Sequence, residues 1–340
     1  MQLPGDWENS VPEKNNSALV CVSGGVDSTA SLARCTQIFD SVRAVYVDTA
    51  GRGAPESAVQ CCSELGVDLN TVPAEEIFKS EVRDYAIKVY LQGKTPNPCA
   101  LCNARVKLAL PYAMLGEGEV LITGHYAWNS HGVLRRGKDP SKDQSYFLSL
   151  VPLEILKRCS FPLSHSMKVD VRREVLEKGL PFIARESQDL CFELDGTGTP
   201  GEIINVEGQT VGRHNGLNAY TPGQRKGLGA YGARKFVVEL DHALNRLVIG
   251  DEEYLYTDRC IIDNINWVQE QKESRFSCLV QIRYRKPASA AEVVLEEGSK
   301  RAAVYFLSPQ KALAPGQVGA LYSSDSVLGG GIIARLGRNR

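Results

Sequence analysis

Two cysteines three positions apart, and a third far along the chain, are the side chains best suited to chemistry. Cys99 and Cys102 form a Cys-x-x-Cys pair, and Cys191 follows a polar run. The pair alone fits a zinc site, a redox pair or chance burial, and there is no second pair at zinc-finger spacing. Pro96 and Pro98 predict an extended, exposed segment that ends where a helix begins, near residue 104. The positive end of that helix would raise the thiolate content of the pair.

A glycine-rich turn near the start of the chain is suited to binding phosphate. Residues 23–28 read Ser-Gly-Gly-Val-Asp-Ser and lie between the apolar run 18–22 and a helical pattern over about 28–39. The glycines allow close backbone approach, the serines add hydroxyl donors, and Asp27 can hold Mg²⁺. There is no Gly-Lys-Ser/Thr, so this is not a Walker loop. The alternative is a simple strand-to-helix turn capped by Asp27 or Ser28.

The elements that must position these groups change character along the chain. In the first half, strand-like runs alternate with helical patterns, which predicts an α/β domain with a parallel sheet and flanking helices. Its expected strands are 18–22, 42–47, 69–72 and 120–123, and its expected helices include 104–115. From about residue 196, short β-rich segments lie between Gly and Pro turns. We therefore expect three domains, at residues 1–195, 196–260 and 261–340.

Composition limits the classes of function. The chain has 340 residues, 43% of them hydrophobic, and a net charge of −1. It shows neither a secretory pattern at its start nor an apolar run of membrane length, so we expect a soluble, cytoplasmic protein. The overall charge does not indicate nucleic-acid binding, but several basic clusters could contact phosphates if they share a face. These clusters lie at 135–138, 225–226, 283–286 and 335–340.

The order of motifs resembles one family closely. The hexapeptide 23–28 is similar to the PP-loop of the ATP pyrophosphatase superfamily, whose members cleave ATP between the α and β phosphates and adenylate a carbonyl oxygen. Together with the later motifs, the chain resembles the bacterial tRNA-specific 2-thiouridylases, the MnmA family, over residues 18–333. Those motifs are residues 95–98 with 102–103, 123–126, 142–147, 189–192, 220–229, 283–285 and 328–331.

The resemblance implies a fold, a substrate and a set of roles. The implied fold is a PP-loop domain, a small central β-rich domain and a C-terminal β-barrel, and the implied substrate is the wobble uridine of tRNAs for Lys, Glu and Gln. Cys102 would be the thiol near the base and Cys191 the persulfide carrier. The implied ATP contacts are Cys21, Val22, Ser23, Gly24, Gly25, Val26, Asp27, Ser28, Val47 and Gly124. Asn97, Pro98 and Cys99 would touch the target base, and Lys142, Asp143, Gln144, Arg283 and Tyr284 would contact tRNA.

Two departures from the family pattern bear on mechanism. The family usually has Asp at the position of Cys99, and its segment after the second strand is longer than residues 47–54. We hypothesise that Cys99, Cys102 and Cys191 together ligate a [4Fe-4S] cluster whose open iron presents sulfide to the adenylated uridine. The rival is a persulfide route that uses Cys191 and Cys102 alone. The sulfur would come from a donor protein or from inorganic sulfide.

Three other functions compete with this interpretation. Another PP-loop tRNA-modifying enzyme, forming an amide or lysidine, would need an amine donor and no cysteines. An RNA-binding protein with an inactive loop would not need Ser23, Asp27 and Ser28 intact. An enzyme that processes thiouridine by removing sulfur would not need ATP. The thiols and the loop therefore favour ATP-dependent thiolation.

Overall fold

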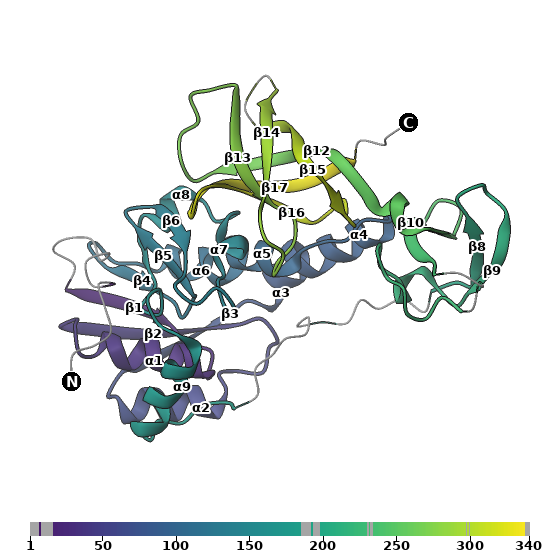
Figure 1. The fold of residues 1–340 in the computed structure, drawn as a ribbon. Helices are drawn as coiled ribbons and strands as arrows, with labels where there is room; N and C mark the ends of the chain where they lie inside the picture. Colours follow the sequence, from purple (N-terminus) through teal and green to yellow (C-terminus); the bar gives the residue numbers. More distant parts are fainter. Residues whose placement is uncertain are drawn as a thin grey trace.

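The computed structural model describes residues 7, 16–184, 192, 198–229, 231, 234–296, 298 and 300–336. These residues form an N-terminal α/β domain, a small β-rich central domain and a C-terminal β-barrel (Figure 1). The fold class predicted from the sequence is confirmed. Among the described residues, no helix is long and apolar enough to cross a membrane.

The first domain is built on a five-stranded parallel sheet in the order β3-β2-β1-β4-β7. Its strands are β1 (Ser17–Cys21), β2 (Ser41–Asp48), β3 (Asp68–Pro73), β4 (Val120–Ile122) and β7 (Cys159–Ser160). Side chains of a strand alternate between the two faces of the sheet. Ala18 and Val20 of β1 accordingly pack into one buried cluster, and Leu19 packs into another. The chain leaves β1 toward β2 and returns to β4 on the other side. This topological switch point is where open α/β sheets bind ligands.

Helices cover both faces of this sheet (Figure 1). On one face lie α1 (Val26–Cys35), α2 (Glu56–Glu64) and α9 (Lys168–Glu177). The other face is covered by the helix over residues 98–113. A continuous helical rod of α3 (Glu75–Phe78), the π-helical η2 (Lys79–Asp84) and α4 (Tyr85–Leu91) extends from the end of β3 toward the central domain (Figure 1). Neither this rod nor α9 was expected from the sequence. The short helices α7 (Ser145–Leu148) and α8 (Leu153–Leu156) complete the domain.

The helix that follows the Cys-x-x-Cys pair begins earlier than expected. It comprises α5 (Pro98–Cys102), the π-helical η3 (Asn103–Lys107) and α6 (Ala109–Ala113), so it starts at Pro98 and not near residue 104. The prediction of an extended segment through both cysteines was therefore wrong. The Asn97 side chain accepts a hydrogen bond from the Ala100 amide at 3.2 Å, and proline suits the first helical position.

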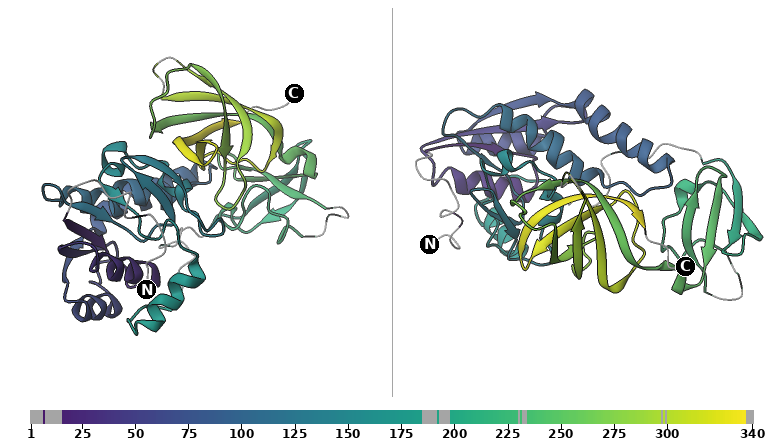
Figure 2. Two further views of the ribbon diagram at one scale, coloured as in Figure 1. Left: turned by 60° about the vertical axis from the view of Figure 1, so that its left-hand side comes forward. Right: turned by 90° about the horizontal axis from the view of Figure 1, so that it is seen from above.

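The central domain has a four-stranded sheet in the order β10-β11-β8-β9. Its strands are β8 (Gly201–Asn205), β9 (Thr210–His214), β10 (Phe236–Asp241) and β11 (Arg246–Gly250), with the 3-10 turns η4 (Leu217–Ala219) and η5 (Glu252–Leu255). Its core is its own, and it contains Ile203, Val237, Leu240, Leu247 and Ile249. The domain lies at the far end of the α3–α4 rod (Figure 2).

The C-terminal barrel has six strands, closed by pairing between the first and the last. They are β12 (Tyr256–Trp267), β13 (Arg275–Gln281), β14 (Ser289–Leu295), β15 (Arg301–Lys311), β16 (Val318–Ser323) and β17 (Ser326–Leu336). The expected boundary at 260/261 falls inside β12, which pairs with β15 from Tyr256 onward. We therefore propose that the third domain starts at Tyr256. A hairpin of the first domain, β5 (Ala127–Ser130) and β6 (Val133–Arg136), joins the barrel sheet at β17.

One buried cluster spans the first domain and the barrel. It takes apolar side chains from the sheet, from the α5–α6 helix and from the barrel strands, so the two domains share a core. Its members include Leu19, Val45 and Leu121, then Ala100 and Leu108, then Val318, Ala320 and Tyr322.

Candidate active site

The PP-loop follows β1, runs into the first turn of α1 and is held by its own serines. The Ser23 amide donates to Ser28 Oγ at 3.0 Å, and the two hydroxyl oxygens lie 3.1 Å apart. Gly24 has φ +75°, a conformation that glycine tolerates, and its carbonyl accepts from Ser57 Oγ at 3.1 Å. Helix α1 starts without a side-chain cap, so its first amides are left to bind an anion.

Asp27 is the charged centre of this loop. Its carboxylate oxygens lie 2.8 and 2.7 Å from Lys168 Nζ, and Tyr126 Oη donates to Oδ1 at 2.8 Å. Burial, with the Asp27 charge, raises the pKa of Tyr126 well above its usual range, so the phenol stays protonated. The Lys168 ammonium already places a positive charge at both oxygens. Asp27 thus fits a cation, and Mg²⁺ there would replace Lys168 as its counter-ion.

Gly124 lies against the PP-loop. A Cβ atom on it would lie 2.9 Å from the Asp27 carbonyl carbon and 3.0 Å from its oxygen, so only glycine fits. The segment after β2, which departs from the family pattern, is held by a side chain of its own. The Asp48 carboxylate accepts from the amides of Ala50, Arg52 and Gly53 at 3.1, 3.3 and 2.6 Å, which folds this segment into a tight turn.

The thiols lie beside the same edge of the sheet. Cys102 is 5% exposed and packs in a small cluster with Phe78, Val82 and Val106, which Val47 from the end of β2 also contacts. Cys99 lies one turn earlier on α5 and is exposed. Val47, a predicted ATP contact, therefore packs against the same cluster as a predicted catalytic thiol.

Cys191, the third thiol, lies outside the described residues. Its neighbour Phe192 is described, and it packs against Phe78 with ring centroids 6.0 Å apart, in the cluster that contains Cys102. Among the described residues no three His, Cys, Asp or Glu side chains form a metal-binding group.

Two residues expected to touch the target base are turned inward. Asn97 is 9% exposed, and its side chain caps α5 through Oδ1 and donates through Nδ2 to Tyr146 Oη at 3.4 Å. Pro98 is also buried. Of the three residues expected at the base, only Cys99 presents an exposed side chain.

The residues expected to contact tRNA come together at the junction with the barrel. Arg136 donates to Asp143 Oδ2 and to Gln281 Oε1, both at 2.9 Å, and Gln281 Nε2 donates to the Arg283 carbonyl at 3.2 Å. These bonds connect segment 142–144 with segment 283–284. Asp143 is 8% exposed and also accepts from the Gly137 amide and from Ser145, so its side chain supports the junction internally.

The other expected tRNA residues are partly exposed around this junction. Tyr284 is half-buried and its ring lies 4.4 Å from that of Phe147, so one of its faces is already covered. Arg283 donates to the Ala312 carbonyl at 3.3 Å. Gln144 accepts from the Tyr126 amide at 3.0 Å, which links this segment to the Asp27 partner Tyr126.

His125 lies next to Gly124 and is neutral at ordinary pH. Burial, aided by the positive charge of Lys107, lowers its pKa to about 4. Its Nδ1 lies 2.7 Å from Thr123 Oγ1, and its ring packs edge-on against Phe161. A neutral imidazole here can exchange hydrogen bonds without adding charge to the site.

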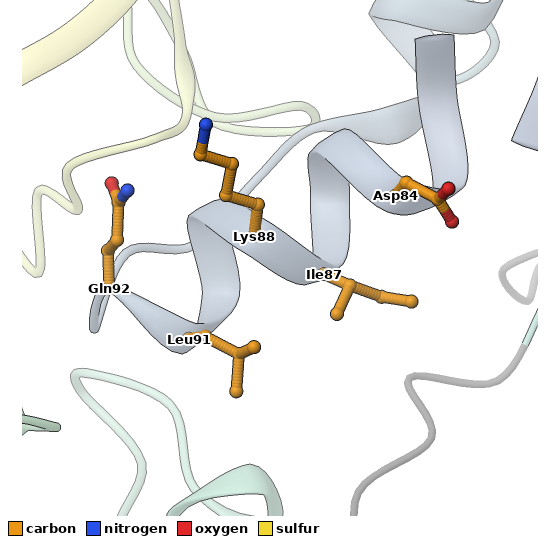
Figure 3. A pocket seen from close by; sticks show the side chains of 5 residues that line it. All are labelled: Asp84, Ile87, Lys88, Leu91 and Gln92. Carbon is orange, nitrogen blue, oxygen red and sulfur yellow. The ribbon is translucent and has the colours of Figure 1, made fainter. Parts of the chain in front are cut away.

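A groove elsewhere on the surface contains none of this chemistry. It has a volume of ≈ 400 Å³, and Asp84, Ile87, Lys88, Leu91 and Gln92 of the α3–α4 rod line it (Figure 3). Lys88 and Gln92 point away from Leu91, which is 65% exposed. The lining has no thiol and no phosphate loop, so we assign the candidate site to the sheet edge.

Sequence reasoning missed three residues that shape the site. Lys168 pairs with Asp27 from a helix that was not predicted, and nothing in its local sequence indicates this. Tyr126 and Tyr146 both belong to motifs shared with the family, but their hydrogen-bond partners are distant in sequence. The role of Asn97 as a helix cap could have been predicted, because Asn-Pro is a typical start of a helix.

Comparison with known protein families gives consistent matches along the chain. Residues 16–194 match the tRNA methyl transferase HUP domain, 194–251 the tRNA methyl transferase PRC-barrel domain, and 257–333 the aminomethyltransferase beta-barrel domain. The tRNA-specific 2-thiouridylase MnmA of Syntrophotalea carbinolica is 35% identical over 351 residues, covering 95% of this chain and 99% of that protein. That of Aquifex aeolicus is 37% identical over 360 residues, covering 92% and 98%.

A solved structure gives a more distant likeness. The U34-tRNA thiolase NcsA of Methanococcus maripaludis, determined with its [4Fe-4S] cluster, aligns with 16% identity and a TM-score of 0.35. The alignment covers 55% of this chain and 66% of that one.

Proposed function

Because this chain belongs to the family of tRNA-specific 2-thiouridylases, we propose that it uses ATP to replace the 2-oxygen of the wobble uridine in tRNA with sulfur. The observation that carries the proposal is the meeting of two kinds of group at one sheet edge. Val47, at the end of β2 beside the PP-loop, packs in the same cluster as Cys102. An activated base bound there would lie within reach of both.

The first step is activation of the base. The uracil O2 attacks the α-phosphorus of ATP, the bond from that phosphorus to the bridging oxygen breaks, and pyrophosphate leaves. The amides at the start of α1 and the hydroxyls of Ser23 and Ser28 would bind the phosphates. Mg²⁺ held by Asp27 would neutralise phosphate charge when bound. AMP then leaves the carbon readily, whereas oxide would not.

The second step is transfer of sulfur. A persulfide on Cys191 attacks C2 of the adenylated uridine through its outer sulfur, and AMP departs. The Cys102 thiolate then attacks the Cys191 sulfur, which forms a Cys102–Cys191 disulfide and leaves the sulfur on the base. The transferred sulfur is reduced and two thiols are oxidised, so a dithiol reductant must restore the enzyme. A sulfur donor protein that carries a persulfide would supply the next sulfur to the reduced enzyme. Inorganic sulfide could serve instead by attacking Cys191 in the Cys102–Cys191 disulfide, which forms the Cys191 persulfide and releases the Cys102 thiolate without the reductant.

A second route is favoured by the exposed position of Cys99, one helical turn from Cys102. In it, Cys99, Cys102 and Cys191 would hold three irons of a [4Fe-4S] cluster and leave the fourth open. Anaerobic purification followed by iron and sulfide analysis separates the two routes. The cluster route requires about four irons per chain in the wild type and their loss in Cys99→Ala. An iron-free protein with full activity leaves the persulfide route.

The proposed substrates are the tRNAs for Lys, Glu and Gln, and the proposed compartment is the cytoplasm. Lys142, Gln144, Arg283 and Tyr284 would bind the RNA around the barrel junction. Mass spectrometry of tRNA nucleosides from a deletion strain tests the substrate set, because each substrate tRNA loses its thiouridine.

The test of the whole proposal is tRNA-dependent release of AMP. We expect Asp27→Ala to abolish it while the fold remains, because the residue stands in the first turn of α1 and its side chain is 32% exposed. Asp170→Ala removes a half-exposed carboxylate from α9 and serves as the control. Wild-type AMP release by Asp27→Ala contradicts the proposal. Release by the wild type without any thiouridine would favour another PP-loop modification.

A further inference from the structure

The Tyr146 hydroxyl joins three parts of the molecule. It accepts a hydrogen bond from Asn97 Nδ2 at 3.4 Å and donates one to the Val318 carbonyl of β16 at 3.0 Å. Its side chain is 0% exposed and lies in the core shared by the first domain and the barrel. In Figure 1, α5 and α7 lie beneath the barrel at this place.

The segment that Tyr146 holds depends on the barrel for its backbone partners. The Thr95 amide donates to the Pro315 carbonyl at 2.7 Å, and Gln317 Nε2 donates to the carbonyls of Thr95 and Pro96 at 3.2 and 3.3 Å. These bonds place the chain just before α5 on the β16 side of the barrel. Asn97 is the last residue of this segment, and its side chain fixes the first turn of α5.

Asn97 therefore connects the barrel to the thiols. Its Oδ1 accepts from the Ala100 amide inside the turn that carries Cys99 and Cys102, and its Nδ2 is directed to Tyr146. If the Tyr146 hydroxyl is absent, a buried amide and a buried carbonyl each lose a partner, and a shift of that turn is the simplest way to recover them.

We propose that Tyr146 is a positioning residue, which fixes the orientation of the Cys99–Cys102 turn relative to the barrel through Asn97. The inference rests on the proposed function. Its consequence is that RNA bound at the barrel junction meets thiols at a fixed distance. Small displacements of reacting groups reduce rates far more than they reduce affinity.

The test is Tyr146→Phe, which keeps the ring that packs against Phe147 and Tyr284. We expect the single-turnover rate of thiolation to fall about tenfold, while the dissociation constant for tRNA stays within about twofold. Tyr322→Phe is the matched control. Its phenol is also 0% exposed at this junction, but its hydroxyl lies 3.1 Å from Ser145 Oγ and does not contact Asn97.

A double-mutant cycle makes the assignment specific. Asn97→Ser keeps a good cap for α5 but loses the amide that reaches Tyr146. If the two residues act through one hydrogen bond, the double variant reacts no more slowly than the slower single variant. If the rate losses of the two single variants multiply in the double variant, the inference is wrong. If Tyr146→Phe does not fold, an unchanged rate in Asn97→Ser alone also overturns it.

The remaining outcomes of these experiments distinguish failure of the positioning role from failure of the proposed function. Equal losses of rate in Tyr146→Phe and Tyr322→Phe would show a general weakening of the junction and reject the positioning role. Loss of tRNA affinity in Tyr146→Phe at unchanged rate would reject it too. A wild-type protein that makes no thiouridine would contradict the proposed function instead.

Discussion

The barrel and the central domain are both β-rich and both follow the PP-loop domain, yet they are attached to it differently. The barrel shares a continuous core with the parallel sheet and makes hydrogen bonds to the segment before α5. The central domain has its own core and meets the end of α4, where Tyr90 Oη donates to the Leu217 carbonyl at 3.1 Å. The barrel is thus part of the frame of the active site, and the central domain is a separate module.

The largest expected effect is on stability, and it tests whether the shared core and the central core unfold independently. Leu134→Ala, at a 0% exposed position in the shared core, should lower the free energy of unfolding by about 2–5 kcal/mol. Hydrogen exchange should show the sheet and the barrel losing protection together. Leu247→Ala makes the same truncation in the central core and should affect that domain alone. Barrel protection lost without loss in the sheet would break the comparison.

Two glycines offer a smaller test at the two contacts. Gly316 has φ +91°, and a Cβ atom on it would lie 2.9 Å from the Thr95 carbonyl oxygen. Gly93 has φ +77°, and a Cβ atom on it would lie 2.5 Å from the Leu240 carbonyl oxygen. Alanine at either position should cost about 1–2 kcal/mol through strain. We expect Gly316→Ala to slow thiolation and Gly93→Ala to leave it unchanged. Equal effects on the rate would give both domains the same role.

Acid should lower the stability of the first and the central domain, each through a histidine with a lowered pKa. Burial lowers the pKa of His125 to about 4, and it lowers that of His242, beside Tyr90, with Asp241 opposing the shift. As pH falls from 6.5 toward 4, the unfolded chain binds protons that the folded histidines do not, so stability decreases with falling pH. Because the pKa of His125 is lowered further than that of His242, the region around His125 should lose more stability over this range. Hydrogen exchange between pH 7 and 4 measures this, and a larger loss of protection around His242 contradicts it.

The smallest expected effect concerns RNA binding. Arg283 lies at the barrel junction and Arg246 on the central sheet, where it pairs with Glu202 at 3.2 Å. Arg283→Gln should reduce the slope of log affinity for tRNA against log salt by about one. Arg246→Gln should leave the slope unchanged. Titrations at several salt concentrations decide it, and an unchanged slope for Arg283→Gln removes that side chain from the interface.

Local patterns were enough to predict much of this fold. The strand before residues 23–28, the alternation of strands and helices, and the later β-rich segments all follow from hydrophobic period and turn residues. The α3–α4 rod was missed because its charged face obscures a thin apolar stripe, and it includes a π-helical stretch that shifts the helical period. The start of α5 was missed because Pro98 was interpreted as a continuation of extended chain.

The site was predicted less completely than the fold. Residue types identified the PP-loop and the thiols, but the pairing of Asp27 with Lys168 joins residues 141 positions apart and depends on how α9 packs against α1. Likewise, Asn97 and Asp143 belong to motifs expected to touch RNA, yet their side chains are buried and bonded internally. Whether a polar side chain faces a ligand or supports its neighbours is decided by tertiary packing.

The exposure of Cys99 makes the protein suited to site-selective labelling. Among the nine described cysteines it is the exposed one, and burial raises the pKa of Cys21 to about 12 and that of Cys62 to about 11, so those thiols react slowly with alkylating reagents. A maleimide dye would therefore attach at Cys99 faster than at any other described cysteine. Such a probe sits on the first turn of α5 and can report by fluorescence when RNA covers that turn.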